Sequence, residues 1–431
     1  MRFSKSIRKW LFYVHLTAGS LAGIVILIMS VTGVLLAYQR QIIPWVDRDI
    51  RSVPSRPDQA RLSGGMLLAR VCATEPSTPS GVTVHSNPAR PVEVSFGRDR
   101  TVYFNSYTGA AIGVASQKTR SFFLSVEGVH RWLGVSEERR PLGRLITGIA
   151  NLAFLVLILT GSFLWWPKNW TWRGVRAAVT LRWSQRTSRA RYWNWHTVTG
   201  FWCAIPLLVI VSCGVVMSFP WANNLLYRMT ANVPPLAQQS ASAPSAALFS
   251  RAEGITDQKA SLDERPREHE LGEMGRKNPG IVGTATAKGS CSAWDFGQID
   301  TLWDHAEQQV PGWQTISLRV PTNRAPAVFT IDQGDGGHPN ERSQLTLDWR
   351  TGATLRWEPF SSYNEGRRLR SWVRFLHTGE AGGMAGQMIA ALAASGVCIL
   401  VPTGLVMAWR RLMRSRNESA ARDDHEMAVL Q

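Results

Sequence analysis

"HTVTGFWCAIPLLVIVSCG", residues 196–214, decides the fold because an earlier stretch, "HLTAGSLAGIVILIMSVTG" at residues 15–33, has the same pattern. Each stretch begins with a histidine, has a glycine four residues later and another glycine fourteen residues after that, and is otherwise mainly apolar. A helix has about 3.6 residues per turn, so the histidine and both glycines lie along one helix face. These residues are His15, Gly19 and Gly33 in the first stretch and His196, Gly200 and Gly214 in the second.

Four stretches of this 431-residue chain are apolar over the length of about 20 residues that a helix needs to cross a bilayer. The first is preceded by basic residues, as a signal peptide is, but its apolar part is too long and no small-residue cleavage site follows it. We therefore expect a retained membrane anchor. The predicted spans are 11–38, 145–166, 197–219 and 385–409.

The basic residues indicate how the spans are oriented. Segment 167–195 contains seven Lys or Arg and no Asp or Glu, and the segments flanking the first and last spans at the chain ends are also basic. Short cytoplasmic segments are enriched in Lys and Arg, so we expect both termini and segment 167–195 in the cytoplasm. Segments 39–144 and 220–384 would lie in the periplasm, outside a bacterial inner membrane. Because topology accounts for the formal net charge of +17, we expect a lipid bilayer and no nucleic acid as partner.

The remaining segments also repeat. The second and fourth spans end in similar motifs, "LTGSFLWW" (159–166) and "PTGLVMAW" (402–409). Alternating apolar residues at 92–113 and 326–357 predict paired strands. Helical patterns precede these strands at 63–73 and 296–309. The fold class that we expect is an α-helical membrane protein with four transmembrane helices in two parallel repeats, each with an extracytoplasmic α+β domain.

The predicted domain order follows from these segments. It is transmembrane helix 1 (1–40), a first periplasmic domain (41–120), a re-entry helix with transmembrane helix 2 (121–166), a basic cytoplasmic loop (167–195), transmembrane helix 3 (196–220), a second periplasmic domain (221–370), a re-entry helix with transmembrane helix 4 (371–410) and a cytoplasmic tail (411–431). Residues 233–290, rich in Ala, Ser and charge, predict a mobile insertion in the second domain. Cys72 and Cys291 both fall in periplasmic segments, and the sequence leaves open whether they form a disulfide.

The repeat makes two matched pairs from four histidines. His15 and His196 lie at the cytoplasmic ends of equivalent spans, and His130 and His377 lie in equivalent segments that re-enter the membrane from outside. Two histidines that face each other across a helix bundle suit bis-imidazole ligation of haem iron. A nearby glycine leaves room for a porphyrin that lies flat against its ligand helix. Gly19 and Gly200 are predicted to do so for an inner haem, and Gly33 and Gly214 for an outer haem.

Simpler roles also fit these residues. A single interfacial histidine is more often a hydrogen-bonded residue than a ligand, glycines along a span commonly pack helices, and intramembrane histidines also suit a proton path. Matched pairs at both faces, with glycines in register, favour two haems b. The candidates to pair with haem propionates are Arg189 and Arg191 inside, and Arg131, Arg144, Arg370 and Arg374 outside.

Two haems at opposite faces would carry electrons stepwise across the membrane. The chain has no GxGxxG loop after a strand, which argues against a Rossmann-type site for NAD or flavin. We therefore expect the electrons to come from a quinol or from another membrane or cytoplasmic electron donor. The sequence identifies no catalytic residue apart from the predicted haem ligands.

The chain resembles the PepSY-associated transmembrane proteins, a family that includes ferrioxamine reductases of the FoxB type and related iron-uptake membrane proteins. The resemblance covers nearly the whole chain. It is carried by "HRWLG" (130–134), "LTGSFLWWP" (159–167), "FLHTGEAGG" (375–383) and the strand-turn units ending in "YTGA" (107–110) and "RTGA" (350–353).

This resemblance implies a function in iron uptake. In the family, two haems b are bound by histidines that match His15, His196, His130 and His377, and PepSY-like periplasmic domains receive a ferric siderophore. Reduction to Fe(II) weakens the hold of the siderophore on iron. Two alternatives are a di-haem reductase of another periplasmic acceptor and a haem-free PepSY scaffold or protease-modulating membrane protein.

Overall fold

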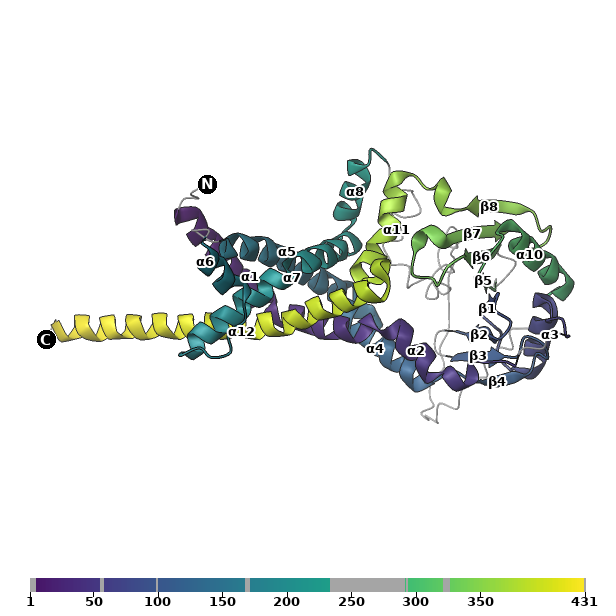
Figure 1. Cartoon of the computed structure of the whole chain (residues 1–431), viewed down its shortest axis with the longest axis horizontal. Coiled ribbons are helices and arrows are strands. Elements are labelled where there is room, and N and C mark those ends of the chain that lie inside the picture. The colour runs from purple at the N-terminus through teal and green to yellow at the C-terminus, as the bar shows by residue number, and fades with distance from the viewer. Residues whose placement is uncertain are drawn as a thin grey trace, which may run out of the picture.

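The computed structural model describes residues 5–54, 58–97, 100–166, 171–232, 291, 294–320 and 326–429, with side chains as far as residue 414. It consists of a bundle of long helices and, at one end of the bundle, a domain built on a β-sheet (Figure 1). The insertion predicted at 233–290 lies outside the described residues.

Four long helices form the bundle, and each is long and apolar enough to cross a membrane. They are α1 (Lys5–Ala37), α5 (Arg140–Trp165), α7 (Ser188–Ser218) and α12 (Gly383–Val429). Each contains one of the four predicted apolar stretches to within a residue. The prediction of four membrane-spanning helices is therefore confirmed as far as helix length and composition can confirm it.

Two of these helices are longer than predicted. α7 begins at Ser188, inside the predicted loop 167–195, because the Thr187 side chain caps its first turn. Residues 188–195 are therefore helical. α12 continues to Val429, through the segment predicted to be a separate tail, because no glycine or proline interrupts the chain beyond Gly404.

Shorter helices connect the spans to the sheet domain. α4 (Gln117–Trp132) precedes α5, and α11 (Glu365–Thr378) precedes α12, as predicted for the two re-entry helices. α4 packs against α1 and α5, whereas α11 packs against α7 and α8. The other short helices are α2 (Gln39–Val46), α6 (Trp172–Val179) and α8 (Pro220–Met229).

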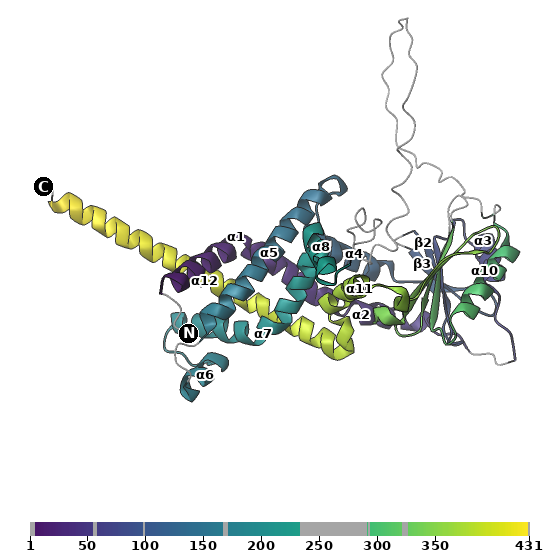
Figure 2. The same ribbon diagram turned by 90° about the horizontal axis from the view of Figure 1, so that it is seen from above.

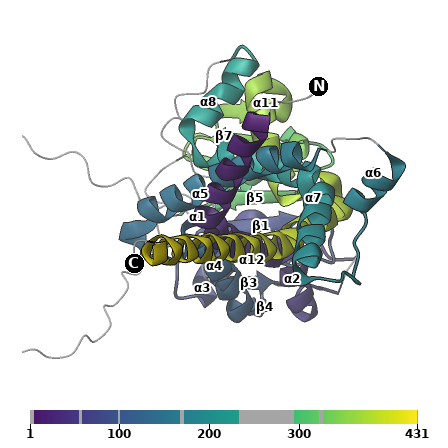
Figure 3. The ribbon, with the colours of Figure 1, turned by 90° about the vertical axis from the view of Figure 1, so that its left-hand side faces the viewer.

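α1 and α7 occupy opposite corners of the bundle. Each packs against both α5 and α12, and Figure 3 shows the bundle from the end away from the sheet domain. Side chains from all four helices meet in its centre, namely Ile26, Ala150, Ile158, Leu207, Val211, Ala393 and Val397. Side chains of α1 and α7 that point inward can therefore face each other across the bundle.

The strands form one sheet rather than two. They are β1 (Gly81–His85), β2 (Val92–Phe96), β3 (Arg100–Phe104), β4 (Ala111–Val114), β5 (Thr315–Arg319), β6 (Ala327–Asp332), β7 (Arg342–Leu347) and β8 (Thr354–Glu358). The order is β4-β3-β2-β1-β5-β6-β7-β8, with antiparallel pairing throughout. The prediction of two separate α+β domains is therefore wrong. Pairing of β1 with β5 removes two exposed strand edges, which explains why the halves merge.

Two helices cover one face of this sheet. α3 (Gly64–Thr74) and α10 (Phe296–Gln309) match the two predicted helical patterns and pack against each other. Leu68, Ile299 and Phe329 are among the fully buried residues of the core between these helices and the sheet. A disulfide between Cys72 and Cys291, with Cα atoms 6.0 Å apart, joins the two halves. The pairing that the sequence left open is therefore formed.

The bundle separates two regions of the molecule. The sheet domain lies at one end, and the N-terminal end of α1 and the C-terminal end of α12 lie at the opposite end (Figures 1 and 2). α2 and α4 connect the sheet domain to the bundle on one side, and α11 does so on the other. Each of the two re-entry helices therefore reaches the bundle directly from the sheet domain.

Candidate metal-binding histidine pairs

The four predicted histidines form two pairs inside the helical part. His15 of α1 and His196 of α7 face each other at the end away from the sheet, with ring centroids 6.3 Å apart and ring planes at 87°. His130 of α4 and His377 of α11 face each other nearer the sheet, with centroids 6.2 Å apart and planes at 59°. We call them the inner pair and the outer pair.

The centroid distances distinguish a shared metal from a direct hydrogen bond. Metal–imidazole bonds of about 2.0 Å, and nitrogens about 1.1 Å from each ring centre, put two imidazoles on opposite sides of one metal about 6 Å apart, centroid to centroid. A direct N–H···N hydrogen bond of about 2.9 Å would bring the centroids to about 5 Å. Both observed separations agree with the first geometry, and both also lie in the range of about 4.5–7 Å that ordinary ring contacts have. Among the described residues, no cluster of three or more His, Cys, Asp and Glu side chains could hold a metal ion. A metal shared by either pair would need its remaining ligands from another group, as haem iron has from its porphyrin.

At the inner pair, neighbouring threonines determine which ring nitrogen is available. The hydroxyl of Thr160 donates to a backbone carbonyl of its own helix at 2.7 Å, so its oxygen accepts from Nδ1 of His15 at 2.9 Å. Nδ1 of His196 lies 3.0 Å from the Leu400 carbonyl and 3.1 Å from the hydroxyl of Thr403. Both Nδ1 atoms therefore carry the proton, and the Nε2 lone pair is left for a metal.

The outer pair is held in the same manner. Nδ1 of His130 lies 2.9 Å from Oγ1 of Thr32, whose own proton goes to the Ile28 carbonyl at 2.7 Å. Nδ1 of His377 lies 2.8 Å from the Ile210 carbonyl and donates to it. A histidine that binds a metal through one nitrogen almost always donates from the other, which fixes the ring orientation. All four histidines have this arrangement.

A glycine directly follows each of the three threonines that bond to a histidine, Thr32, Thr160 and Thr403. The sequence patterns predicted no role for two of these glycines, Gly161 and Gly404. A Cβ on either would lie 3.2 Å from Cε1 of the adjacent inner histidine, and a Cβ on Gly33 would lie 3.5 Å from Cε1 of His130. The glycine thus lets the imidazole lie against the helix while the threonine holds its Nδ1. The Thr-Gly pair recurs in three spans, and this recurrence could have identified these residues from the sequence. In α7, the sequence position that corresponds to Thr32-Gly33 is occupied by Cys213-Gly214.

The other predicted glycines contact protein rather than open space. A Cβ on Gly19 or Gly200 would lie 3.6 Å from a leucine of a neighbouring span. A Cβ on Gly214 would lie 2.7 Å from Nδ2 of Asn151, a buried amide that donates to the Val211 carbonyl. Gly33 makes room for a histidine ring and Gly214 for an asparagine. Their role beside an outer porphyrin stays a prediction.

The predicted outer arginines differ in their partners. Arg131 pairs with Glu127 at 2.7 Å and Arg374 with Glu380 at 3.4 Å, so a carboxylate already balances each charge. Arg370 donates to the Asn223 side chain at 2.8 Å. Within the described ranges, no carboxylate pairs with Arg144 or Arg370. These two are the outer guanidiniums left to bind an anionic group.

Glu380 connects the outer pair to the sheet domain. Its side chain is 7% exposed and accepts hydrogen bonds from Arg374 at 3.4 Å and from Arg40 at 3.2 Å. Arg40 also donates to the Asp335 carbonyl, in the turn between β6 and β7, at 2.5 Å. Because Glu380 follows His377 closely in sequence, this network joins a sheet turn to the end of the helix that carries a candidate ligand.

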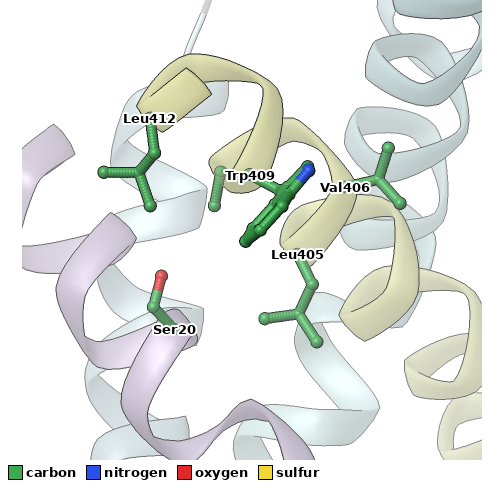
Figure 4. Close-up of a pocket in the computed structure, with 6 residues that line it drawn as sticks. Ser20, Leu405, Val406, Trp409 and Leu412 are labelled. Carbon is green, nitrogen blue, oxygen red and sulfur yellow. The ribbon is translucent and has the colours of Figure 1, made fainter. Parts of the chain in front are cut away.

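A cavity of about 390 Å³ lies between α1 and α12 (Figure 4). Its lining residues are Ser20, Leu405, Val406, Ala408, Trp409 and Leu412. Trp409 is 60% and Leu412 58% exposed, so the cavity opens on the outer surface of the bundle. Leu405, one of its lining residues, directly follows Gly404, the glycine that contacts His196. None of the predicted site residues lines it.

Comparison with known proteins gives one result for the whole chain. Among curated proteins no match is found. The family described as "PepSY-associated TM region" matches residues 12–411. This range includes all four histidines, the four spans and the described part of the sheet domain. The chain therefore belongs to the PepSY-associated transmembrane family.

Proposed function

We propose that this protein is an inner-membrane di-haem b electron-transfer protein that reduces a ferric siderophore at the periplasmic face and so releases Fe(II) for iron uptake. His15 and His196 would be the axial ligands of an inner haem, and His130 and His377 those of an outer haem. The observation that carries the proposal is the geometry of the two pairs. In each pair the ring centroids lie 6.2 or 6.3 Å apart, and each ring has its Nδ1 bound to a neighbouring oxygen, so the two Nε2 lone pairs would hold the iron.

The positions of the pairs support transfer along the bundle. From His15 to Thr32, which holds His130, α1 rises about 26 Å at 1.5 Å per residue. Bound haem b takes up and releases one electron per iron. Two histidines on each iron would occupy both axial positions, so the acceptor would not bind to the iron. The protein then has to bring the acceptor close to the outer pair without ligating it.

The orientation follows from the same arrangement. We propose two parallel repeats, with both termini in the cytoplasm and the sheet domain in the periplasm. The basic 171–191 segment and the chain ends lie at the end of the bundle away from the sheet, which agrees with the enrichment of Lys and Arg on the cytoplasmic side. A quinol in the bilayer or a cytoplasmic electron donor would reach the inner pair, and the ferric siderophore would reach the outer pair beside the sheet domain.

The decisive experiment is an absorption spectrum of the purified chain, with haem quantified per protein. We expect two haems b with six-coordinate spectra, one lost in His15→Ala and the other in His377→Ala. His305→Ala is the matched control, because His305 lies on α10 in the sheet domain, away from both pairs. A folded protein that is colourless after expression with sufficient haem would overturn the proposal.

The acceptor is tested separately. Dithionite-reduced protein, freed of excess reductant, is mixed with ferric hydroxamate, catecholate and citrate complexes while the haem bands are followed. Rapid reoxidation by at least one complex, with Fe(II) trapped by a ferrous chelator, is expected. Reoxidation by cupric ion or another oxidant, with no ferric complex active, would keep the two haems and exclude the siderophore.

A further inference from the structure

Two hydrogen-bond donors at the inner end of the bundle have no acceptor. Nε of Arg191 and Nε1 of Trp195 are buried, and neither has a hydrogen-bond partner in the part of the chain that the structure describes. Both residues lie on α7, one helical turn apart, and Trp195 directly precedes His196. Burying a donor without an acceptor is costly, so these two donors point to a group that the described residues do not supply.

Neighbouring donors at the same end of the bundle are satisfied. Trp202 donates its indole N–H to the Val179 carbonyl at 2.9 Å, and Trp165 donates to the Ala178 carbonyl at 3.4 Å. Arg8 donates to two backbone carbonyls at the end of α5, at 2.9 and 3.0 Å. Lack of a partner is therefore not a general property of Trp and Arg at this depth. It distinguishes Arg191 and Trp195.

The two side chains are also held in place. The Trp195 ring meets the edge of the Trp183 ring at 5.5 Å between centroids. The guanidinium carbon of Arg191 lies 5.9 Å from the centre of the Trp195 ring and 5.9 Å from that of Tyr192. A charged donor and a neutral donor are thus fixed side by side. In the described ranges no carboxylate pairs with Arg191. An anionic oxygen would satisfy both donors and also balance the charge of Arg191.

We infer that Arg191 and Trp195 bind the propionate carboxylate of the haem held by His15 and His196, an inference that rests on the proposed function. Arg191 lies five residues before His196, about 7.5 Å along the helix towards the cytoplasmic end. This depth suits a carboxylate that hangs from one edge of a porphyrin. An anionic lipid headgroup offers the same oxygen chemistry, and the experiment distinguishes the two sources.

The test compares Trp195→Phe and Arg191→Gln with matched controls at the same end of the bundle. Trp193→Phe removes an indole N–H from a residue that is 59% exposed, and Arg186→Gln removes the same charge at an exposed position just before α7. The haem midpoint potentials of the full chain are measured against pH in nanodiscs of neutral lipid and of anionic lipid. The His15→Ala background, which retains the outer pair, shows which haem responds.

We expect both variants to lower the potential of the inner haem and the controls to leave it unchanged. A propionate without its donors places uncompensated negative charge beside the iron, which favours the ferric state. Its pKa also rises, so the pH range over which the inner potential changes moves upward. Equal shifts in both lipids support the propionate, and a shift in anionic lipid alone assigns the site to a headgroup and overturns the inference.

The inference can also fail by itself. If the wild-type chain binds two haems and both variants leave both potentials and their pH dependence unchanged, Arg191 and Trp195 do not bind the propionate, although the proposed function stands. If the wild-type chain binds no haem, the proposed function fails first. The two failures are therefore distinguished by the haem content of the unmodified protein.

Discussion

Thr32 of α1 and His130 of α4 are joined by a 2.9 Å contact between Oγ1 and Nδ1, and the threonine oxygen accepts the imidazole N–H. The contact connects a membrane span to a re-entry helix. The orientation of a candidate iron ligand therefore depends on a residue that cannot itself bind iron here. Such supporting residues offer tests of the site that leave all four histidines in place.

Thr32→Val is expected to weaken outer haem binding while keeping the shape of the side chain. Without the hydroxyl acceptor, His130 loses the partner that orients its ring and makes it more basic. Loss of such a partner typically costs about 10–100-fold in affinity for the bound metal. Haem titration of the apoprotein, with the two sites resolved by their spectra, measures the effect. Thr197→Val is the control, because its hydroxyl donates only to backbone carbonyls of its own helix. Unchanged outer affinity in Thr32→Val would show that the contact does not support a ligand.

Gly161→Ala is expected to abolish inner haem binding and spare the outer site. The added methyl group would lie 3.2 Å from Cε1 of His15, and α5 has little room to move because it packs between α1 and α7. The imidazole would have to rotate away from its partner. Haem stoichiometry should fall from two to one. Two haems in Gly161→Ala would show that the ring tolerates the methyl group.

Gly19→Ala separates the two roles considered for glycine in the spans. Its methyl group would make only an ordinary contact, 3.6 Å from the side chain of Leu157, so the protein alone should fold normally. If a porphyrin lies against Gly19 as the sequence predicts, inner haem is nevertheless lost. Circular dichroism and haem content measured on the same sample distinguish the cases. Normal helicity with both haems retained would assign Gly19 to helix packing.

Glu380→Gln is expected to destabilise the junction between the sheet domain and α11. The substitution leaves Arg40 and Arg374 without their carboxylate. Removing one partner of a buried pair costs about 3–5 kcal/mol, and partial exposure of both arginines reduces this to about 1–3 kcal/mol. Thermal unfolding and hydrogen exchange of residues 365–378 measure the loss. Glu137→Gln breaks an exposed ion pair with Arg140 and should change stability by less than about 0.5 kcal/mol. Equal effects of the two substitutions would contradict a structural role for Glu380.

Reduction of the disulfide is expected to loosen the sheet domain and leave the bundle intact. The Cys72–Cys291 bond joins the end of α3 to the chain just before α10, and loss of a native disulfide costs about 2–5 kcal/mol in small domains. The unreduced, denatured chain should show three free thiols, those of Cys203, Cys213 and Cys398. Hydrogen exchange in α3 and α10 should rise after reduction, with that in α5 unchanged. Five free thiols before reduction would contradict the bond.

Sequence patterns predict the helices and strands of this fold better than they predict which of these elements pair with each other. Apolar runs locate the spans because a bilayer requires a long, continuous apolar helix, and the pattern at 296–309 coincides with α10. The pairing of β1 with β5 could not be read in the same way. Both strands lie outside the segments predicted as strands, 92–113 and 326–357. Each alternates apolar and polar residues, but the alternation does not say which of its two edges is paired or with which strand. Two domains were therefore expected where the chain forms one sheet.

The same is true of the candidate site, where the sequence located the histidines but not the residues that support them. Equal spacing in two spans places His15 and His196 at equivalent positions, and the structure brings them together. The supporting residues are less visible, because a threonine within a span usually bonds to its own helix, as Thr160 and Thr403 also do. The second contact of these threonines, to a histidine on another helix, is visible only in the structure. The exchange of Thr32 for Cys213 at the corresponding position further hides the pattern.

Four of the contacts described above take one member from each half of the chain: the inner pair, the outer pair, the disulfide and the β1–β5 contact. During synthesis, the polypeptide that ends before Ser188 therefore holds one imidazole of each couple, one sulfur and an open strand edge. If the two pairs hold haem as proposed, neither site can be completed until the second half has been inserted. Cofactor loading would then be a late step of biogenesis, and a ribosome-stalled N-terminal half would bind no haem.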